Sequence, residues 1–176
     1  MTSAFSARHK SDDKRSIWTG ELACPQATTA LAHAFTKIAE PGLCVLLAGP
    51  VGAGKSYFAR AAIQALMSQY GGVEDVPSPS FTLVQTYELG TLDVWHADLY
   101  RVTNPDELIE LGLDQASDTA LCLIEWPDRL GDLRPEDVIE ITLTPDPTDE
   151  ERRAVRIEGP KHLIDRLKLA MEASVA

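Results

Sequence analysis

The sequence lacks the features that mark membrane-spanning chains and chains that grip nucleic acid. No stretch of it approaches the roughly 18 to 20 consecutive apolar residues of a membrane-spanning helix, so we expect no membrane contact. No basic tract is longer than Arg152-Arg153, and 16 basic residues stand against 27 acidic ones, which gives a net charge of −11. Because affinity for nucleic acid depends on neutralising phosphates, this balance argues against direct binding. We expect any nucleic acid in its pathway to be held by a partner.

Cysteine is scarce as well. The chain has three, Cys24, Cys44 and Cys122, an odd number without metal-like spacing. Cys44 and Cys122 lie in apolar runs, which predicts buried thiols in a reducing compartment such as the cytoplasm.

Residues 1–15 are polar and lack an apolar signal core, so we expect a flexible N-terminal extension of a cytoplasmic protein. Residues 16–176 are then expected to form a single domain, with a hydrophobic content (44% overall) that is ordinary for a globular chain.

One short motif is far more informative than the composition. Residues 49–56 read Gly-Pro-Val-Gly-Ala-Gly-Lys-Ser and match G-x-x-x-x-G-K-[ST], the phosphate-binding loop of P-loop nucleoside triphosphatases. Chance alone would place such a match in about half a percent of chains of this length. The context agrees, because residues 43–48 are an apolar run typical of a buried strand and apolar residues recur at helical spacing after the loop. The sequence therefore predicts a nucleoside triphosphate site here.

Each residue type in the loop has a physical reason. Glycines let successive backbone amides point into a concavity for phosphate oxygens, and the positive end of the following helix adds to the attraction. Lys55 brings an ammonium to the terminal phosphates, and Ser56 offers a hydroxyl to Mg²⁺. The residues expected to bind the ATP phosphates are Val51, Gly52, Ala53, Gly54, Lys55 and Ser56.

Two carboxylates compete for the magnesium and for the chemistry. Glu125 follows the apolar run 121–124, so we expect it at the carboxyl end of a buried strand, where it would hold the metal directly or through water. Asp98 ends another expected strand, and we place it near the terminal phosphate as a water-orienting group, general base or second metal contact. A solvent-facing strand end for Glu125 and a turn cap for Asp98 are the plainer interpretations.

The pattern of the whole chain predicts an α/β P-loop fold. We expect a mixed, mostly parallel central sheet flanked by helices, with an antiparallel hairpin around Gly90. Strands are expected over residues 16–22, 43–48, 81–89, 92–99, 121–124, 138–143 and 154–157. Helices are expected over 27–38, directly after the phosphate-binding loop, over 104–112 and over 161–173. Residues 146–153 are expected to form a charged loop.

Five segments together resemble one family, the small bacterial ATPases called TsaE, formerly YjeE. They are residues 52–56, 78–84, 96–101, 107–112 and 123–127, in the family's order and spacing. The likeness spans residues 17 to 170, and the four segments beyond the phosphate loop make it specific. Ser56 and Ser80 stand where threonine is more common in the family, which preserves the hydroxyl.

The resemblance implies a Mg-dependent ATPase that serves a complex. Such a protein acts with the partners TsaB and TsaD in forming threonylcarbamoyladenosine in tRNA, and it contacts tRNA only indirectly. The match puts magnesium on Ser56 and Glu125 and hydrolysis on Asp98 with Lys55, at a rate expected to be slow without partners. It also implies that Thr82, in a switch-like stretch, senses the terminal phosphate or metal, and that Thr28 touches the adenine or ribose.

Two other classes of protein use the same loop. A small-molecule kinase is the main alternative, but it usually carries an arginine-rich lid, and no such cluster occurs between the motifs. A regulatory GTPase would need the base-reading N-K-x-D signature, which the sequence lacks. The roles of His96 and Trp126 stay open between the nucleotide site and the core.

Overall fold

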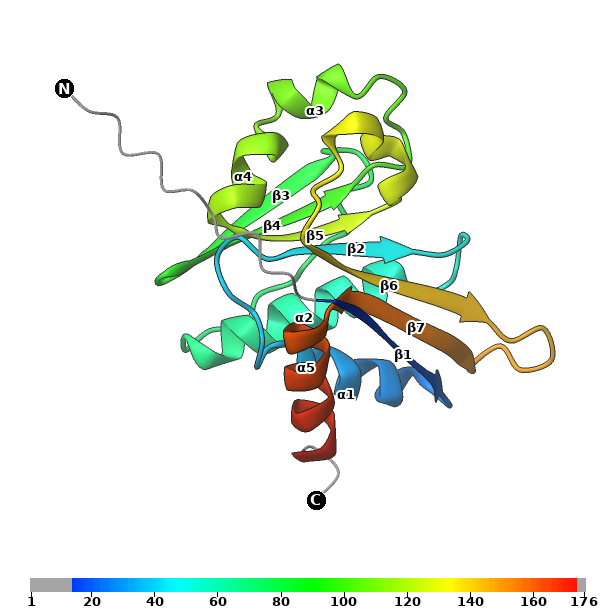
Figure 1. The fold of residues 1–176 in the computed structure, drawn as a ribbon. Helices are drawn as coiled ribbons and strands as arrows, with labels where there is room; N and C mark the ends of the chain where they lie inside the picture. Colours follow the sequence, from blue (N-terminus) through cyan, green and yellow to red (C-terminus); the bar gives the residue numbers. More distant parts are fainter. Residues whose placement is uncertain (1–13, 174–176) are drawn as a thin grey trace.

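A seven-stranded sheet organises the chain (Figure 1). A computed structural model describes residues 14–173; the expected N-terminal extension therefore lies outside the described residues, apart from Lys14 and Arg15. The strands are β1 (Arg15–Leu22), β2 (Cys44–Ala48), β3 (Val84–Leu89), β4 (Leu92–Asp98), β5 (Leu121–Glu125), β6 (Val138–Pro145) and β7 (Arg153–Pro160). The helices are α1 (Pro25–Phe35), α2 (Lys55–Gln69), α3 (Asp106–Glu110), α4 (Leu113–Thr119), the 3₁₀ helix η1 (Pro127–Leu133) and α5 (Lys161–Ala173).

The sheet is mixed, in the order β1-β7-β6-β2-β5-β4-β3. Its four central strands, β6, β2, β5 and β4, run parallel to one another. The outer pairings β1 with β7, β6 with β7 and β3 with β4 are antiparallel, and the last is the hairpin expected around Gly90. The predicted α/β fold with a mixed sheet is thus confirmed.

The two apolar runs are strands buried on both faces. Along β2, Val45 and Leu47 pack into one hydrophobic cluster, while Cys44 and Leu46 pack into a second cluster on the opposite face. Strand β5 alternates in the same way. A strand covered on both faces is apolar at nearly every position, which is why these runs are uninterrupted up to Glu125 at the end of β5.

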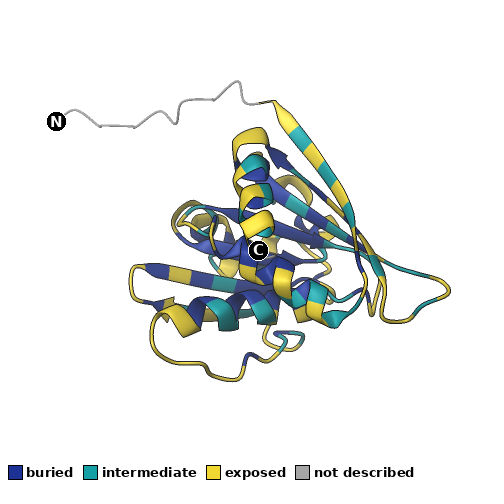
Figure 2. Ribbon diagram, turned by 90° about the horizontal axis from the view of Figure 1, so that it is seen from below, coloured by how far each residue is buried: buried dark blue, intermediate teal, exposed yellow. Residues whose placement is uncertain are grey.

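Helices cover both faces of the sheet. Helices α1, α2 and α5 lie on one face, and α3 and α4 lie on the other (Figure 1). Seen from the three-helix side, the outer surfaces of these helices are exposed and their inner surfaces are buried (Figure 2). Edge strand β1 alternates exposed and half-buried residues, as an antiparallel strand with one covered face should. No helix among residues 14–173 is long and apolar enough to cross a membrane.

Three local features differ from the sequence prediction. Residues 81–83 form a turn rather than the start of β3, and Leu83 has a positive φ of 63° while its carbonyl accepts a hydrogen bond of 2.9 Å from the Asp98 amide. The helix predicted to end near Gly112 is followed directly by α4, because Gly112 turns the chain at φ 78°. The 3₁₀ helix after β5 was not predicted either.

Candidate nucleotide-binding site

A cavity of about 410 Å³ opens at the carboxyl end of the central strands. The residues that line it come from the phosphate loop, the start of α2 and the ends of β4 and β5. They are Val51, Gly52, Gly54, Lys55, Ser56, Tyr57, Asp98, Tyr100, Glu125 and Trp126.

Parallel pairing explains why these residues meet. Strand β2 runs into the phosphate loop, and its neighbour β5 pairs Glu125 with Leu47, close to the end of β2. In the next pair, Asp98 at the end of β4 lies in register with Glu125. Carboxyl ends of parallel strands share one edge of the sheet, so both carboxylates predicted from the sequence line the same cavity as the phosphate loop.

The phosphate loop depends on glycine at two places. Gly49 has φ 135°, and a Cβ built there would lie 2.3 Å from the carbonyl oxygen of Leu143 on β6, so the loop packs directly against that strand. Gly54 has φ 101° and precedes the first residue of α2. Only glycine adopts these conformations without strain, and the resulting bend aims the start of α2 at the cavity.

Lys55 is buried and is held by the loop itself. Its Nζ donates hydrogen bonds to the carbonyl oxygens of Gly49, at 2.7 Å, and Pro50, at 2.8 Å. The same ammonium lies 3.7 Å from the centroid of the Trp126 ring. Burial lowers the pKa of Lys55, and the nearby Glu125 and Asp98 carboxylates partly offset that effect. The ammonium is therefore placed beside the cavity before any nucleotide enters.

Glu125 links the loop to a buried histidine. Its Oε2 accepts a hydrogen bond of 2.8 Å from Ser56 Oγ, and its Oε1 lies 2.9 Å from His96 Nε2. Glu125 and His96 are both about 1% exposed, which excludes the solvent-facing interpretation of Glu125. The two predicted metal residues thus lie side by side, and the open question about His96 is answered by its contact with the site carboxylate.

Asp98 is buried and is held by two donors. Ser80 Oγ donates to Oδ2 at 3.0 Å, and the backbone amide of Tyr100 donates to Oδ1 at 3.0 Å. Ser80 also lies 2.8 Å from Ser78 Oγ. Asp98 therefore caps a turn and also lines the cavity, and its role beside a terminal phosphate stays a prediction.

Thr28 and Thr82 are not among the residues that line the cavity. Thr28 is buried in the first turns of α1, and Thr82 is exposed in the turn before β3. Thr29, the next residue, lies closer to the cavity, because its Oγ1 is 3.0 Å from the hydroxyl of Tyr57, a residue that lines the cavity. A nucleotide contact for Thr28 or Thr82 stays a prediction.

Sequence reasoning did not single out two aromatic residues of the cavity, Tyr57 and Tyr100. Tyr100 packs on Trp126 with ring centroids 4.9 Å apart, and Trp126 has a left-handed φ of 59° immediately after Glu125. This backbone turn places the Trp126 ring over Lys55, and the half-buried ring also packs against the second hydrophobic cluster. Nothing in the sequence reveals a positive φ at tryptophan.

Within residues 14–173 no group of three or more His, Cys, Asp or Glu side chains is arranged to hold a metal. One hydroxyl and one carboxylate, Ser56 and Glu125, are nonetheless a donor set that fits Mg²⁺, since this ion keeps several waters and takes phosphate oxygens as further ligands.

Comparison with known proteins agrees with this geometry. The model of the family described as "Threonylcarbamoyl adenosine biosynthesis protein TsaE" matches residues 22–155, which include the phosphate loop and both carboxylates. The chain belongs to the TsaE family. A TsaE protein from Rickettsia felis is 36% identical over 146 residues, covering 81% of this chain and 82% of the relative. One from Bacillus subtilis is 33% identical over 139 residues, covering 78% and 84%.

A solved structure supports the fold independently. The crystal structure of YdiB from Bacillus subtilis superposes on this chain with a TM-score of 0.70 and covers 93% of it and 99% of YdiB. At 22% sequence identity this likeness concerns the fold alone. The TsaE resemblance predicted from five short segments is confirmed by the family model and by the two relatives.

Proposed function

We propose that the chain binds Mg-ATP in this cavity and hydrolyses it as the ATPase subunit of a cytoplasmic machine that makes threonylcarbamoyladenosine in tRNA, together with TsaB and TsaD. The observation that carries the proposal is the convergence of Lys55, Ser56, Glu125 and Asp98 on one cavity at the end of the phosphate-loop strand. The relatives named above are tRNA threonylcarbamoyladenosine biosynthesis proteins, which supports the pathway.

The residues fit a triphosphate and its metal. Lys55 donates hydrogen bonds to two loop carbonyls. Because an ammonium has three N–H donors, one donor is left for a phosphate oxygen. The amides of the loop and of the first turn of α2 add donors to the same concavity. Ser56 and Glu125 would hold Mg²⁺, which when bound supplies positive charge to the phosphate oxygens.

Hydrolysis needs a group that orients the attacking water and accepts its proton. Asp98 is the second carboxylate of the cavity, and its two oxygens are fixed by Ser80 and by the Tyr100 amide. Its orientation is thus set by residues outside the phosphate loop. Water attack on the terminal phosphorus would release ADP and inorganic phosphate, with Asp98 as the base.

The tRNA part of the proposal requires partners. With a net charge of −11, the chain has little means of holding tRNA by itself, so TsaB and TsaD would present it. ATP turnover by this subunit would then serve chemistry that takes place on a partner.

Replacing Lys55 tests the proposal. Lys55→Ala removes the ammonium, and we expect ATP affinity measured by calorimetry to fall more than about 100-fold, since charge-assisted contacts to phosphate are strong. The same variant should fail to restore ATP-dependent threonylcarbamoylation of tRNA to purified TsaB and TsaD, whereas the unaltered chain should succeed. Unchanged ATP affinity would contradict the loop assignment.

Following the phosphate of labelled ATP addresses the kinase alternative. Among the described residues that line the cavity there is no arginine to close over a transferring phosphate. If the chain instead moves phosphate from ATP to a small acceptor, labelled phosphate would appear on that acceptor and not as inorganic phosphate.

A further inference from the structure

The phosphate loop is anchored on its outer side by an arginine about one hundred residues away in the sequence. Arg153, the first residue of β7, donates from Nε to the carbonyl oxygen of Ala53 at 3.1 Å and from Nη2 to that of Gly52 at 3.5 Å. Its Nη1 donates to the carbonyl oxygens of Glu150 at 2.5 Å and Arg152 at 2.9 Å. One guanidinium therefore joins the phosphate loop to the segment between β6 and β7.

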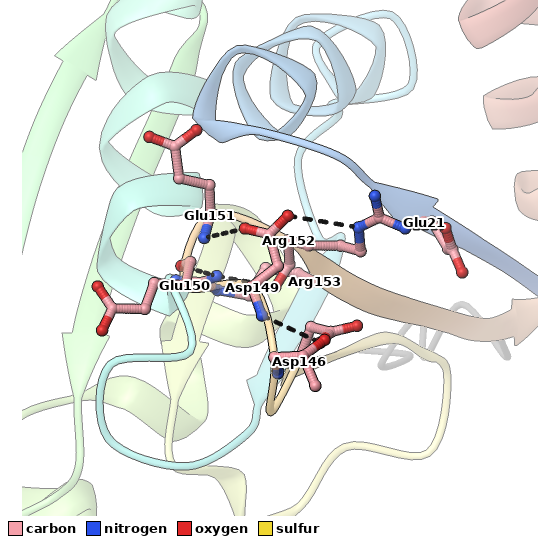
Figure 3. Close-up of polar contacts among 8 residues, drawn as sticks. Glu21, Asp146, Asp149, Glu150, Glu151, Arg152 and Arg153 are labelled. Atoms are coloured by element: carbon pink, nitrogen blue, oxygen red, sulfur yellow. Dashed lines mark hydrogen bonds and ion pairs between the residues drawn. The ribbon is translucent and has the colours of Figure 1, made fainter.

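That segment, residues 146–152, is here called the β6–β7 loop, and it has a defined structure of its own. Asp146 Oδ1 accepts hydrogen bonds from the Thr148 amide at 2.7 Å and the Asp149 amide at 3.2 Å, and the Asp146 amide donates to Arg152 O at 3.0 Å. The Thr148 hydroxyl, which donates to Asp146 Oδ1 at 2.7 Å, and then the Thr148 amide lower the pKa of Asp146. Figure 3 shows the acidic side chains around this loop, with Arg152 extending toward Glu21.

Arg153 and its neighbour Arg152 contact different kinds of groups. Arg152 lies within 3.5 Å of Glu21 and 3.8 Å of Asp149, whereas Arg153 forms no ion pair with any described carboxylate. All its contacts above are to backbone carbonyls. Its guanidinium is therefore bonded to main-chain oxygens rather than paired with a described carboxylate.

The direction of the hydrogen bonds matters for phosphate binding. In a trans peptide the carbonyl and the next amide point in opposite directions, so a guanidinium that holds Ala53 O outward turns the Gly54 N–H away from the β6–β7 loop. Gly52 and Gly54 line the cavity on the other side of this backbone. We propose that Arg153 is a positioning residue for the phosphate loop, which keeps loop amides aimed at the triphosphate through its bridge to the β6–β7 loop.

This inference rests on the proposed ATP binding, and its test uses one measurement that needs no nucleotide. Arg153→Met keeps the aliphatic length and removes the bridge, and Arg152→Gln is the matched control, since it removes a neighbouring charge that does not touch the phosphate loop. In the nucleotide-free protein, hydrogen exchange of the amides in residues 51–56 should be at least about fivefold faster in Arg153→Met than in Arg152→Gln. Equal exchange in the two variants would overturn the inference.

Nucleotide affinity provides the second readout. We expect ATP to bind about tenfold more weakly to Arg153→Met, with affinity in Arg152→Gln within about twofold of the unaltered chain. Arg153→Lys keeps the charge but lacks a guanidinium that can bond two carbonyls at once, so we expect its ATP affinity to be closer to that of Arg153→Met than to that of the unaltered chain. Full ATP affinity in Arg153→Lys would contradict the proposed bridging role of Arg153. Arg153→Lys also serves as the test variant if Arg153→Met does not fold.

The proposed ATP binding and the proposed role of Arg153 can be contradicted independently of each other. Absence of ATP binding by the unaltered chain would contradict the proposed function, while the exchange measurement would still decide whether Arg153 orders the loop.

Discussion

At the scale of single residues, the two carboxylates of the site differ in their hydrogen-bond partners. Glu125 is bonded to Ser56 of the phosphate loop and lies against His96, while Asp98 is bonded to Ser80 and to a backbone amide after β4. Charge on Glu125 therefore acts where the metal is expected, and Asp98 is free of the phosphate loop. Different substitutions should separate these roles.

Glu125→Gln should weaken the dependence of ATP binding on magnesium. The amide keeps the size of the side chain and one oxygen, so the fold should hold, but the negative charge beside Ser56 is lost. We expect the magnesium concentration needed for half-maximal stabilisation of the ATP complex to rise about tenfold, measured by calorimetry in a magnesium titration. ATP affinity in the presence of a chelator should stay unchanged, and an unshifted magnesium titration would move the metal role to Asp98.

Asp98→Asn should spare binding and suppress turnover. Asparagine can retain the contact to the Tyr100 amide through its oxygen, but it cannot accept a proton. General-base catalysis contributes about 10²- to 10⁴-fold, so hydrolysis with TsaB and TsaD present should fall by at least about 100-fold while ATP affinity changes less than about threefold. Normal turnover in this variant would exclude Asp98 as the base.

At the scale of elements, the phosphate loop is fitted to strand β6. Gly49→Ala would place a methyl group 2.3 Å from Leu143 O at a φ of 135°, which combines a steric clash with a strained backbone. We expect a loss of about 3 kcal/mol in the free energy of unfolding, measured by urea denaturation, and loss of ATP binding. Gly72→Ala is the control, because a Cβ there would meet nothing within 4 Å. Equal stability of the two variants would show that the loop can move away from β6.

The elements with strong local patterns were the ones that sequence could predict. The double-sided strands β2 and β5, the hairpin around Gly90 and helix α5 all carry a periodicity that tertiary packing preserves. Helix α4 was missed, because its seven residues contain just two that are buried, Leu113 and Ala116, and show no apolar period. The 3₁₀ helix after Trp126 depends on a left-handed φ that no propensity indicates.

For the site, sequence could identify the chemical groups but not all of their neighbours. The motif marked Lys55 and Ser56, and the strand ends marked Asp98 and Glu125. Their side-by-side placement depends on which strands pair, and this follows from the order of the whole sheet. Arg153 was not found for the same reason, because its contacts to Gly52 and Ala53 bring together segments with no local signal.

At the scale of the whole molecule, burial of two thiols links stability to pH. Burial raises the pKa of Cys122 to about 12 and also raises that of Cys44, whereas a thiol in the unfolded chain has a pKa near 9.0. Above pH 9 the unfolded chain loses protons that the folded chain retains, so the stabilisation is complete below that pH and declines as the pH rises.

The cysteine prediction can be measured with a single variant. Between pH 8 and pH 10 the unaltered chain should lose about 1 kcal/mol more unfolding free energy than Cys122→Ala, in urea titrations at each pH. Other groups titrate in this range, but they are common to both proteins and cancel in the comparison. An identical decline in both would show that the Cys122 thiol ionises in the native state.

The order of the sheet also bears on how the protein is made. Strand β2 is completed by β5 and β6, which begin at residues 121 and 138, so the segment with Lys55 has neither flanking strand until most of the chain has left the ribosome. Pairings between distant segments form late, because closing long loops costs entropy. If ATP binds as proposed, a nascent chain would capture it only after β6 has emerged, and ATP present at that moment would favour the completed sheet over its partly built precursors.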